Sequence, residues 1–241
     1  MKIDFEAYWS PQPLDGKVYG PREILEMEDA AGIDMVVLMP SPDFRPDNRG
    51  LAEAIRGYED RIIGCAQVNP RFGQEAVEEL ETAITRWGLK ALKLMPTFHG
   101  YAVESPTVDP VMEKARELGI PVNIHSGSYN CYPLEIAALA QRYPEVPIIM
   151  DHMGYRFREN QAILAARMCP NIYLGTTLIC VEPILIKFAV KELGPERVVF
   201  GSNAPGSYPD LCVEAIRRLN LGAEAEVLIF GENLARIYKL I

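Results

Sequence analysis

Short apolar runs alternate with longer amphipathic segments along the whole chain. The apolar runs are rich in Val, Ile, Leu and Met and are bounded by Gly, Pro, Asn or Asp, which is typical of buried strands. The segments between the runs carry apolar residues at helical spacing, so a helix is predicted after each strand. The predicted strands are residues 2–9, 33–40, 61–70, 89–96, 120–125, 146–152, 171–179 and 197–202.

The predicted helices have recognisable starts and stops. Pro21 suits the first turn of a helix that Gly32 ends, and Gly88 and Gly119 end two later helices. Residues 10–20 form a polar segment rich in Pro and Gly, predicted to be a long loop that could cover a site. The remaining helices are predicted at residues 50–60, 74–87, 106–118, 131–143, 158–168, 181–193, 209–219 and 224–240.

Eight strands, each followed by a helix, predict a (β/α)₈ TIM barrel. The chain has 241 residues, which is close to the ~250 typical of that fold. No shift in composition marks a boundary, so residues 1–241 are interpreted as a single barrel domain. A doubly wound open sheet would also alternate strand and helix, but its nucleotide-binding members have a glycine-rich turn after the first strand. Here that turn reads Trp-Ser-Pro-Gln-Pro, so the barrel is favoured.

Composition narrows the functional classes. The chain is 49% hydrophobic and 24% charged with a formal net charge of −9. This balance argues against nucleic-acid and anionic-membrane partners, because both require clustered Lys and Arg. No apolar run reaches the ~20 residues of a membrane helix, and the chain opens with Met-Lys-Ile-Asp rather than a signal peptide, so a cytoplasmic location is expected. The five cysteines include no Cys-x-x-Cys pair and are interpreted as reduced thiols.

All three histidines of the chain come just after predicted strands. His125 ends the run Ile-Pro-Val-Asn-Ile-His-Ser-Gly, His152 ends Val-Pro-Ile-Ile-Met-Asp-His-Met-Gly, and His99 follows the strand at 89–96. Residues past the carboxyl ends of parallel strands share one mouth of a barrel, so we expect the three side chains to converge there. For His99 alone, a structural or loop role explains the pattern equally well.

Three charged residues on predicted strands are candidates for the same mouth. Glu6 lies at the inward end of the first strand, where an unpaired buried carboxylate is costly, so a site role is favoured. Lys93 alternates with apolar neighbours and is expected to point into the barrel, to contact a substrate carboxylate or to form a structural ion pair. Asp151 adjoins His152 and is therefore expected to point the other way, to an outer hydrogen bond.

Seven motifs stand in order along the chain: Ile-Asp-Phe-Glu-Ala-Tyr, Gln-Val-Asn-Pro, Leu-Lys-Leu-Met-Pro, Pro-Val-Asn-Ile-His-Ser-Gly, Met-Asp-His-Met-Gly, Phe-Gly-Ser-Asn-Ala-Pro and Gly-Glu-Asn-Leu-Ala-Arg-Ile-Tyr. In this order they resemble the amidohydrolase superfamily, specifically its compact amidohydrolase-2-type branch of metal-dependent hydrolases and aromatic-acid decarboxylases. The resemblance covers nearly the whole chain and implies a barrel enzyme whose site lies at the mouth.

The resemblance also implies a metal site, of which this sequence keeps a part. The family uses a His-x-His pair on the first strand, one His from each of strands five and six, and an Asp after strand eight. His125 and His152 match the two later histidines. The first-strand positions hold Glu6 and Tyr8, and the strand-eight position holds Asn203. Some decarboxylases of this branch resemble the chain in having Glu at the first position, but they keep the second histidine.

These residue types support a site of reduced metal affinity. Glu6, His125 and His152 could hold a divalent ion of the zinc or manganese type with one position left open. The Asn203 amide is a poorer ligand than a carboxylate and cannot act as a general base. Tyr8 would fill the space of the missing ligand or donate a hydrogen bond to substrate. Whether the metal is retained at all is left open by these changes.

The function predicted from these features is that of an amidohydrolase-like hydrolase. It would act on a small carboxylated, ester or lactone substrate, with Glu6, His125, His152 and Asn203 as catalytic residues. Substrate-binding roles are predicted for Tyr8, Lys93 and His99. The alternatives are a decarboxylase, a lyase acting on a small aromatic acid, and a non-catalytic member of the family that binds a small molecule. The oligomeric state, including a homo-oligomer, is left open.

Overall fold

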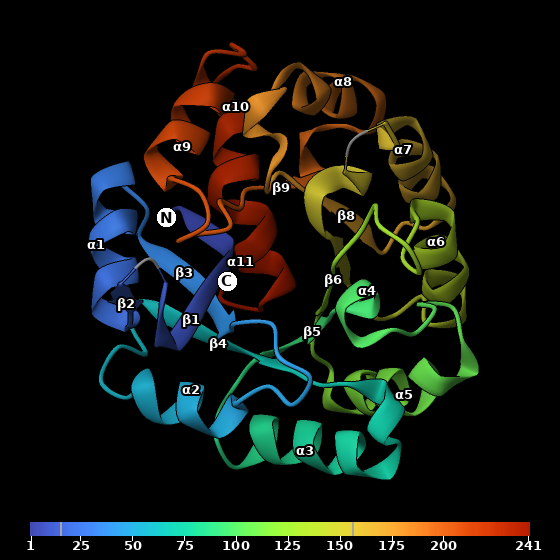
Figure 1. The fold of residues 1–241 in the computed structure, drawn as a ribbon. Coiled ribbons are helices and arrows are strands. Elements are labelled where there is room, and N and C mark those ends of the chain that lie inside the picture. Colours follow the sequence, from blue (N-terminus) through green and yellow to red (C-terminus); the bar gives the residue numbers. More distant parts are fainter. Residues whose placement is uncertain (15, 156) are drawn as a thin grey trace.

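The computed structural model describes residues 1–14, 16–155 and 157–241. In these residues the strands form one curled sheet in the order β2-β1-β3-β4-β5-β6-β7-β8-β9 (Figure 1). Every neighbouring pair is parallel except β1 and β2. The strands are β1 (Ile3–Leu14), β2 (Lys17–Tyr19), β3 (Met35–Pro40), β4 (Ile62–Gln67), β5 (Ala91–Leu94), β6 (Val122–Ile124), β7 (Ile148–Met150), β8 (Ile172–Gly175) and β9 (Val198–Val199).

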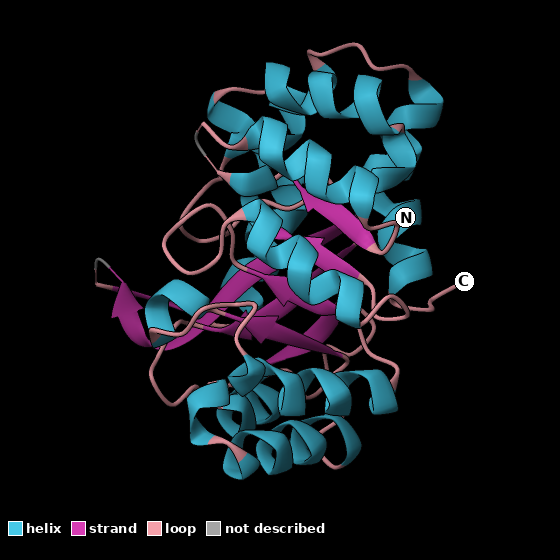
Figure 2. Cartoon of the chain, turned by 90° about the vertical axis from the view of Figure 1, so that its right-hand side faces the viewer, coloured by secondary structure: helices cyan, strands magenta, loops and turns pink. Residues whose placement is uncertain are grey.

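Most helices surround the sheet on its outer side, as Figures 1 and 2 show, whereas the last helix lies over one end of the barrel, where Leu234 and Ile237 pack against the interior cluster. They are α1 (Pro21–Ala31), α2 (Asn48–Ala54), α3 (Gln74–Thr85), α4 (Pro96–His99), α5 (Asp109–Leu118), α6 (Pro133–Arg142), α7 (Glu159–Met168), α8 (Ile184–Leu193), α9 (Pro209–Arg217), α10 (Ala223–Val227) and α11 (Asn233–Ile237). A single π-helical turn, Leu228–Glu232, joins the last two. No helix of the described residues is long and apolar enough to cross a membrane.

A seam between β1 and the segment after β9 closes the barrel. Ala7 pairs with Ala204 in a parallel bridge. The Phe5 amide donates to the Phe200 carbonyl at 3.1 Å, and the Tyr8 amide donates to the Ala204 carbonyl at 2.7 Å. The carboxylate of Asp4 also accepts the Ser202 amide at 3.0 Å. The eight parallel strands, β1 and β3 to β9, therefore form the (β/α)₈ barrel that the sequence predicts.

Alternating side chains of the strands fill the barrel interior. The buried cluster inside it includes Ile3, Phe5, Val37, Cys65 and Ile149, while the complementary faces pack against the helices in a second and larger cluster. The Phe5 ring lies where two glycines leave room for it. A Cβ placed on Gly175 would be 2.4 Å from this ring, and one on Gly201 would be 2.5 Å from it.

The element bounds differ from the predictions mainly in the segment 10–20. The predicted loop is instead an arm in which β1 continues to Leu14 and pairs with β2, with Ser10 opposite Tyr19. Prolines are tolerated in this arm because it is the edge of the sheet, where no further ladder needs their missing N–H groups. The predicted helix ends at Gly32 and Gly119 are confirmed, since both glycines adopt the left-handed conformation.

Candidate active site at the barrel mouth

An irregularity in β1 turns Glu6 and Tyr8 toward the barrel axis. Asp4 is opposite Val36 of β3 and Ala7 is opposite Leu38, so β1 advances three residues while β3 advances two. Such a bulge shifts the alternation of side chains by one residue. Phe5 fills the interior below the bulge, and above it Glu6 and Tyr8 face the same way as Phe5.

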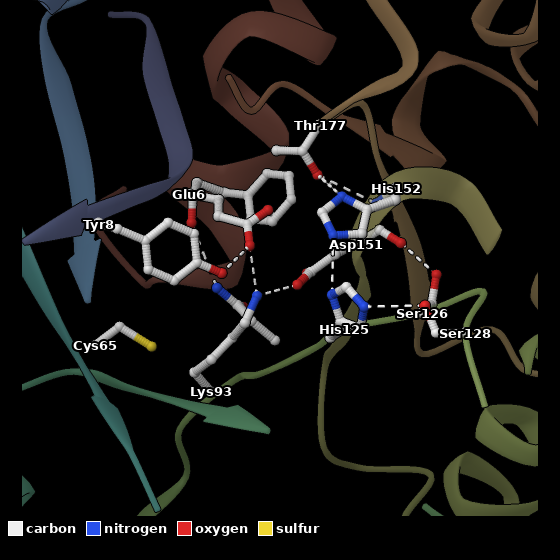
Figure 3. A network of polar contacts seen from close by, with 12 residues as sticks. Glu6, Tyr8, Cys65, Lys93, His125, Ser126, Ser128, Asp151, His152 and Thr177 are labelled. Atoms are coloured by element: carbon white, nitrogen blue, oxygen red, sulfur yellow. Dashed lines mark hydrogen bonds and ion pairs between the residues drawn. The ribbon is translucent and has the colours of Figure 1, made fainter. Parts of the chain in front are cut away.

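A buried ion cluster lies directly beneath the mouth (Figure 3). The Lys93 ammonium donates to Glu6 Oε1 at 2.6 Å and also pairs with Asp151 Oδ2. Tyr8 Oη donates to the same Glu6 oxygen at 2.5 Å. The three charged side chains of the cluster, Glu6, Lys93 and Asp151, are completely buried. Their second carboxylate oxygens, Glu6 Oε2 and Asp151 Oδ1, are buried without a hydrogen-bond partner among the described residues.

The position of Asp151 corrects the expectation of an outer hydrogen bond. Ile149 faces the barrel interior, and Asp151 continues that alternation into the interior. The chain then turns at once, because His152 and Met153 both adopt positive φ, at 60° and 47°. The turn is held by Ser126, whose hydroxyl accepts the Gly154 amide at 3.0 Å and donates to the Asp151 carbonyl. It carries His152 to the mouth above Asp151.

The two expected histidines meet at the mouth. His152 Nε2 lies 3.1 Å from His125 Nδ1, and the ring centroids are 4.9 Å apart. Gly127 makes this approach possible, because a Cβ there would lie 2.3 Å from the Gly154 carbonyl oxygen. The glycine that follows His125 therefore lets the loop after β6 touch the loop after β7.

Thr177, which follows β8, fixes the other side of the His152 ring. Its Oγ1 lies 2.7 Å from His152 Nδ1 and accepts the His152 amide at 3.2 Å. With Nδ1 engaged in this way, Nε2 is aimed at His125 and at the ion cluster. His125 Nε2 faces Ser128 Oγ at 3.4 Å.

The pKa values of these groups follow from burial and from Lys93. Burial raises the pKa of Glu6, but the Lys93 charge, together with smaller effects that include hydrogen bonds from Lys93 and Tyr8, outweighs it and lowers the value to about 2. Burial and the Glu6 charge raise the pKa of Asp151 to about 8. Burial lowers the pKa of His125 to about 3 and that of His152 to about 4. Both histidines are therefore neutral at pH 7, as metal ligation requires.

A cavity of about 470 Å³ opens above these residues. Its floor carries Tyr8, His125, His152 and Asn203. Its walls are largely apolar, and they include the arm formed by β1 and β2. The apolar side chains of the walls include Pro13, Leu14, Pro42, Met95, Leu178 and Pro205. A larger groove of about 860 Å³ lies at the opposite end of the barrel and contains none of the predicted site residues; its basic lining residues are Arg49, Arg56, Arg86, Lys90 and Lys239.

The remaining predicted site residues divide into two groups. Asn203 lines the cavity, and its backbone N–H donates to the Glu6 backbone carbonyl across the seam at 2.9 Å. Lys93 does not line the cavity, because Glu6 and Asp151 hold its ammonium group below the floor. It therefore forms the ion pair that the sequence offered as the alternative to a substrate contact. His99 does not line it either. Its Nε2 lies 2.8 Å from the Asp43 carbonyl oxygen and its ring stacks on Tyr101, so the short helix α4 gives it a packing position.

The donors at the floor fit a divalent ion. One oxygen or nitrogen from each of Glu6, Asp151 and His152 lies within 4.8 Å of the others. Metal–nitrogen bonds of about 2.1 Å place two nitrogens on one ion about 3 Å apart, and His125 and His152 already have this separation. The two unpartnered carboxyl oxygens are ligands of the type that such an ion prefers, and Glu6, which is ionised at pH 7, supplies negative charge.

Comparison with known proteins identifies the family. The model of the family described as Amidohydrolase matches residues 6–240. The chain belongs to the amidohydrolase family. No curated protein matches it. Among solved structures, it is similar to a 2,6-dihydroxybenzoate decarboxylase from Rhizobium, with 17% identity, a TM-score of 0.75 and coverage of 99% of this chain and 98% of the other.

Two further solved structures share the fold of this amidohydrolase. One is a 5-carboxyvanillate decarboxylase from Novosphingobium aromaticivorans, complexed with manganese and 4-hydroxy-3-methoxy-5-nitrobenzoic acid. It is 20% identical, has a TM-score of 0.78, and the match covers 99% of this chain and 96% of that one. The other is an uncharacterised TIM-barrel protein from Bordetella bronchiseptica, 18% identical with a TM-score of 0.82, covering 99% and 98% of the two chains.

Proposed function

We propose that this amidohydrolase is a decarboxylase, a lyase that removes CO2 from a small aromatic carboxylic acid bound at the barrel mouth. The observation that carries the proposal is an apolar cavity with two neutral histidines at its floor and the carboxylates of Glu6 and Asp151 directly beneath them. The similarity to decarboxylases of hydroxylated aromatic acids supports this alternative over the hydrolase that the sequence first suggested.

The floor of the cavity suits decarboxylation better than hydrolysis. Hydrolysis needs a general base to take a proton from the attacking water, and the Asn203 amide that faces the cavity cannot do so. The carboxylates of Glu6 and Asp151 lie beneath the floor, where Lys93 holds one oxygen of each. Loss of CO2 consumes no water, and apolar walls favour a substrate carboxylate that has shed its hydration.

A divalent ion would be held by His125, His152 and Glu6, with the free Asp151 oxygen beside it. When bound, such an ion supplies positive charge that orients the substrate carboxylate and stabilises the electrons left on the ring. Thr177 keeps His152 in the orientation needed to face that position. The apolar walls hold the aromatic ring flat above Asn203 and His125 and exclude water.

The proton that replaces CO2 comes from Tyr8 in this proposal. Loss of CO2 leaves an electron pair on the ring carbon, and a proton must be delivered to that carbon. The two histidines are neutral at pH 7 and Asn203 has no acidic proton, whereas Tyr8 Oη carries one at the cavity floor. Burial and the Glu6 charge raise the pKa of Tyr8 well above 10, so the tyrosinate is short-lived and solvent returns its proton. The Lys93 ammonium, 5.7 Å from the Tyr8 ring, offsets this rise in part.

The test is release of CO2 from a panel of hydroxybenzoates that includes 2,6-dihydroxybenzoate and 5-carboxyvanillate, with manganese present. In D2O the product should carry deuterium on the carbon that lost CO2. Tyr8→Phe should lower kcat by about 10²–10⁴-fold, as loss of a general acid does. Tyr19→Phe is the matched control, because Tyr19 lines the same cavity from the arm, and it should leave kcat within a few-fold of the wild type.

Two results would overturn the proposal. Absence of CO2 release from the whole panel, with tight binding of the same acids, would favour the non-catalytic binding protein. Hydrolysis of an ester or lactone that depends on His125 would restore the hydrolase. Equal activity of Tyr8→Phe and wild type would remove Tyr8 from its role while leaving the decarboxylase intact.

Thr177→Val should weaken manganese binding by about 10–100-fold, because loss of the partner that orients a ligand histidine has that effect. Isothermal titration of the metal-free protein measures it. Thr176→Val is the control, since Thr176 is also buried but exchanges its hydrogen bonds with the backbone of Gly201 instead of a histidine. Equal affinities of the two variants would show that Thr177 does not position His152.

A further inference from the structure

The floor of the site already contains a cation. Lys93 Nζ is bonded to one oxygen of Glu6 and one of Asp151, and the other oxygen of each carboxylate is unpartnered among the described residues. Every charged atom of this cluster is buried. Each carboxylate therefore contacts the lysine through one oxygen and keeps the other oxygen for a divalent ion.

We propose that Lys93 is a resident counter-ion of the metal site, which competes with a divalent ion for the charge of Glu6 and Asp151 and keeps that ion weakly bound and exchangeable. This inference rests on the metal site of the proposed function. It concerns affinity for the ion, so it can be tested without any substrate.

The physical basis is repulsion between two cations that share the same carboxylates. Water and salt do not screen charges at this depth as they do at the surface, so the repulsion is strong. The backbone of Lys93 is fixed, because β5 pairs with β4 and β6 on either side, and its side chain is completely buried beside the two carboxylates. Among the described residues, Lys93 forms ion pairs with Glu6 and Asp151 and with no other carboxylate. No further acid therefore neutralises Lys93 in a way that would leave these two free for the ion.

A lysine with a purely structural role would behave differently on removal. If Lys93 only holds the carboxylates in place, its loss should disorder them and weaken the binding of a metal. If Lys93 competes with the metal, its loss should strengthen binding, and the ion should then take over the neutralisation of both carboxylates.

The experiment compares metal-free wild type, Lys93→Met and Lys90→Met by titration with Mn²⁺ alone. Met has a similar length to Lys without its charge. Lys93→Met should bind Mn²⁺ at least about tenfold more tightly than wild type. Its melting temperature should fall in a chelator and recover with Mn²⁺, by a larger shift than wild type shows. Lys90→Met changes the net charge equally but lies at the opposite end of the barrel, and its affinity should match wild type.

Unchanged or weaker Mn²⁺ binding by Lys93→Met overturns the proposal. If Lys93→Met does not fold without metal, it is refolded with Mn²⁺, and folding that depends on Mn²⁺ supports the proposal while failure to fold with Mn²⁺ overturns it. Equal gains in Lys93→Met and Lys90→Met also overturn it, because net charge would then explain both. None of these outcomes depends on CO2 release, so failure of the decarboxylase proposal would be seen separately.

Discussion

Glu6→Gln and Asp151→Asn, combined in one chain, should lower the free energy of unfolding by about 3–5 kcal/mol at pH 7, because the double variant leaves a buried ammonium without a counter-charge. Each substitution alone should cost about 1 kcal/mol or less. The two effects are therefore expected to be strongly non-additive.

The non-additivity follows from the protonation of the two acids. At pH 7 Glu6 is ionised, while the pKa of Asp151 is raised to about 8 by burial and by the Glu6 charge. When Glu6 becomes Gln, that repulsion disappears and Asp151 can ionise to hold Lys93. When Asp151 becomes Asn, Glu6 still holds it. Loss of both leaves Lys93 with no anion among its described ion-pair partners.

Urea unfolding of the metal-free proteins measures this cycle. Adding Lys93→Met to the double variant should restore most of the lost stability, since a neutral apolar side chain then replaces the unpaired charge. Glu75→Gln is the matched control, because it breaks the exposed Arg45–Glu75 ion pair and should leave the free energy of unfolding nearly unchanged. Additive effects of the two substitutions would show that the acids do not share one charge.

Glu28→Gln should stabilise the protein relative to wild type increasingly as the pH rises from 5 to 8, at a rate of up to about 1.4 kcal/mol per pH unit. Glu28 of α1 is completely buried, and both of its carboxylate oxygens lack a hydrogen-bond partner among the described residues. Burial, with a smaller contribution from the charge of Asp4, raises its pKa well above 4.5.

The sign of the effect follows from that direction. A carboxyl group whose pKa is raised in the folded protein binds more protons there than in the unfolded chain. Its contribution to stability is complete below pH 4.5 and is lost as the pH rises toward the folded value. Gln cannot ionise, so the variant escapes this loss and its advantage over wild type grows with pH.

Urea unfolding at pH 5, 6, 7 and 8 gives the difference between variant and wild type. Glu26→Gln is the control for removal of a carboxylate from the same helix, because Glu26 is exposed and paired with Arg22. A difference that does not change with pH for Glu28→Gln would mean that the Glu28 carboxyl has the same pKa in the folded and unfolded chains.

The sequence is informative about the barrel because local signals agree with the global fold. Apolar runs with flanking turn residues locate the strands, and prolines and glycines mark the helix ends, so the eight repeated units could be predicted without tertiary information. The meeting of His125 with His152 was predictable for the same reason, since parallel strands place their carboxyl ends at one mouth. The motif that follows each histidine even carries the glycine that lets the loops touch.

The finer arrangement of the site depends on contacts between distant residues. The bulge in β1 changes which residues face inward, and no local pattern near Glu6 reports it. The sequence favours a substrate contact of Lys93 only slightly over an ion pair, because the ion-pair partners lie 58 and 87 residues away along the chain. Thr177, which orients His152, lies in none of the quoted motifs. Ser126 lies within one of them, but nothing local shows that it bonds the loop after β7. His99 follows an apolar run like the others, yet helix α4 directs it away from the cavity.

The seam that closes the barrel sets how long the site stays intact. Elsewhere adjacent strands share ladders of two or more paired residues. In contrast, β1 and the segment 200–204 are joined by one bridge and a few backbone hydrogen bonds, one of them from the Asn203 N–H to the Glu6 carbonyl. Partial opening by local fluctuation should begin where the fewest bonds must break. Glu6 and Tyr8 lie on one side of that junction and Asn203 on the other. Amide hydrogen exchange at these positions would therefore report the lifetime of the assembled site, which can be much shorter than the lifetime of the folded protein.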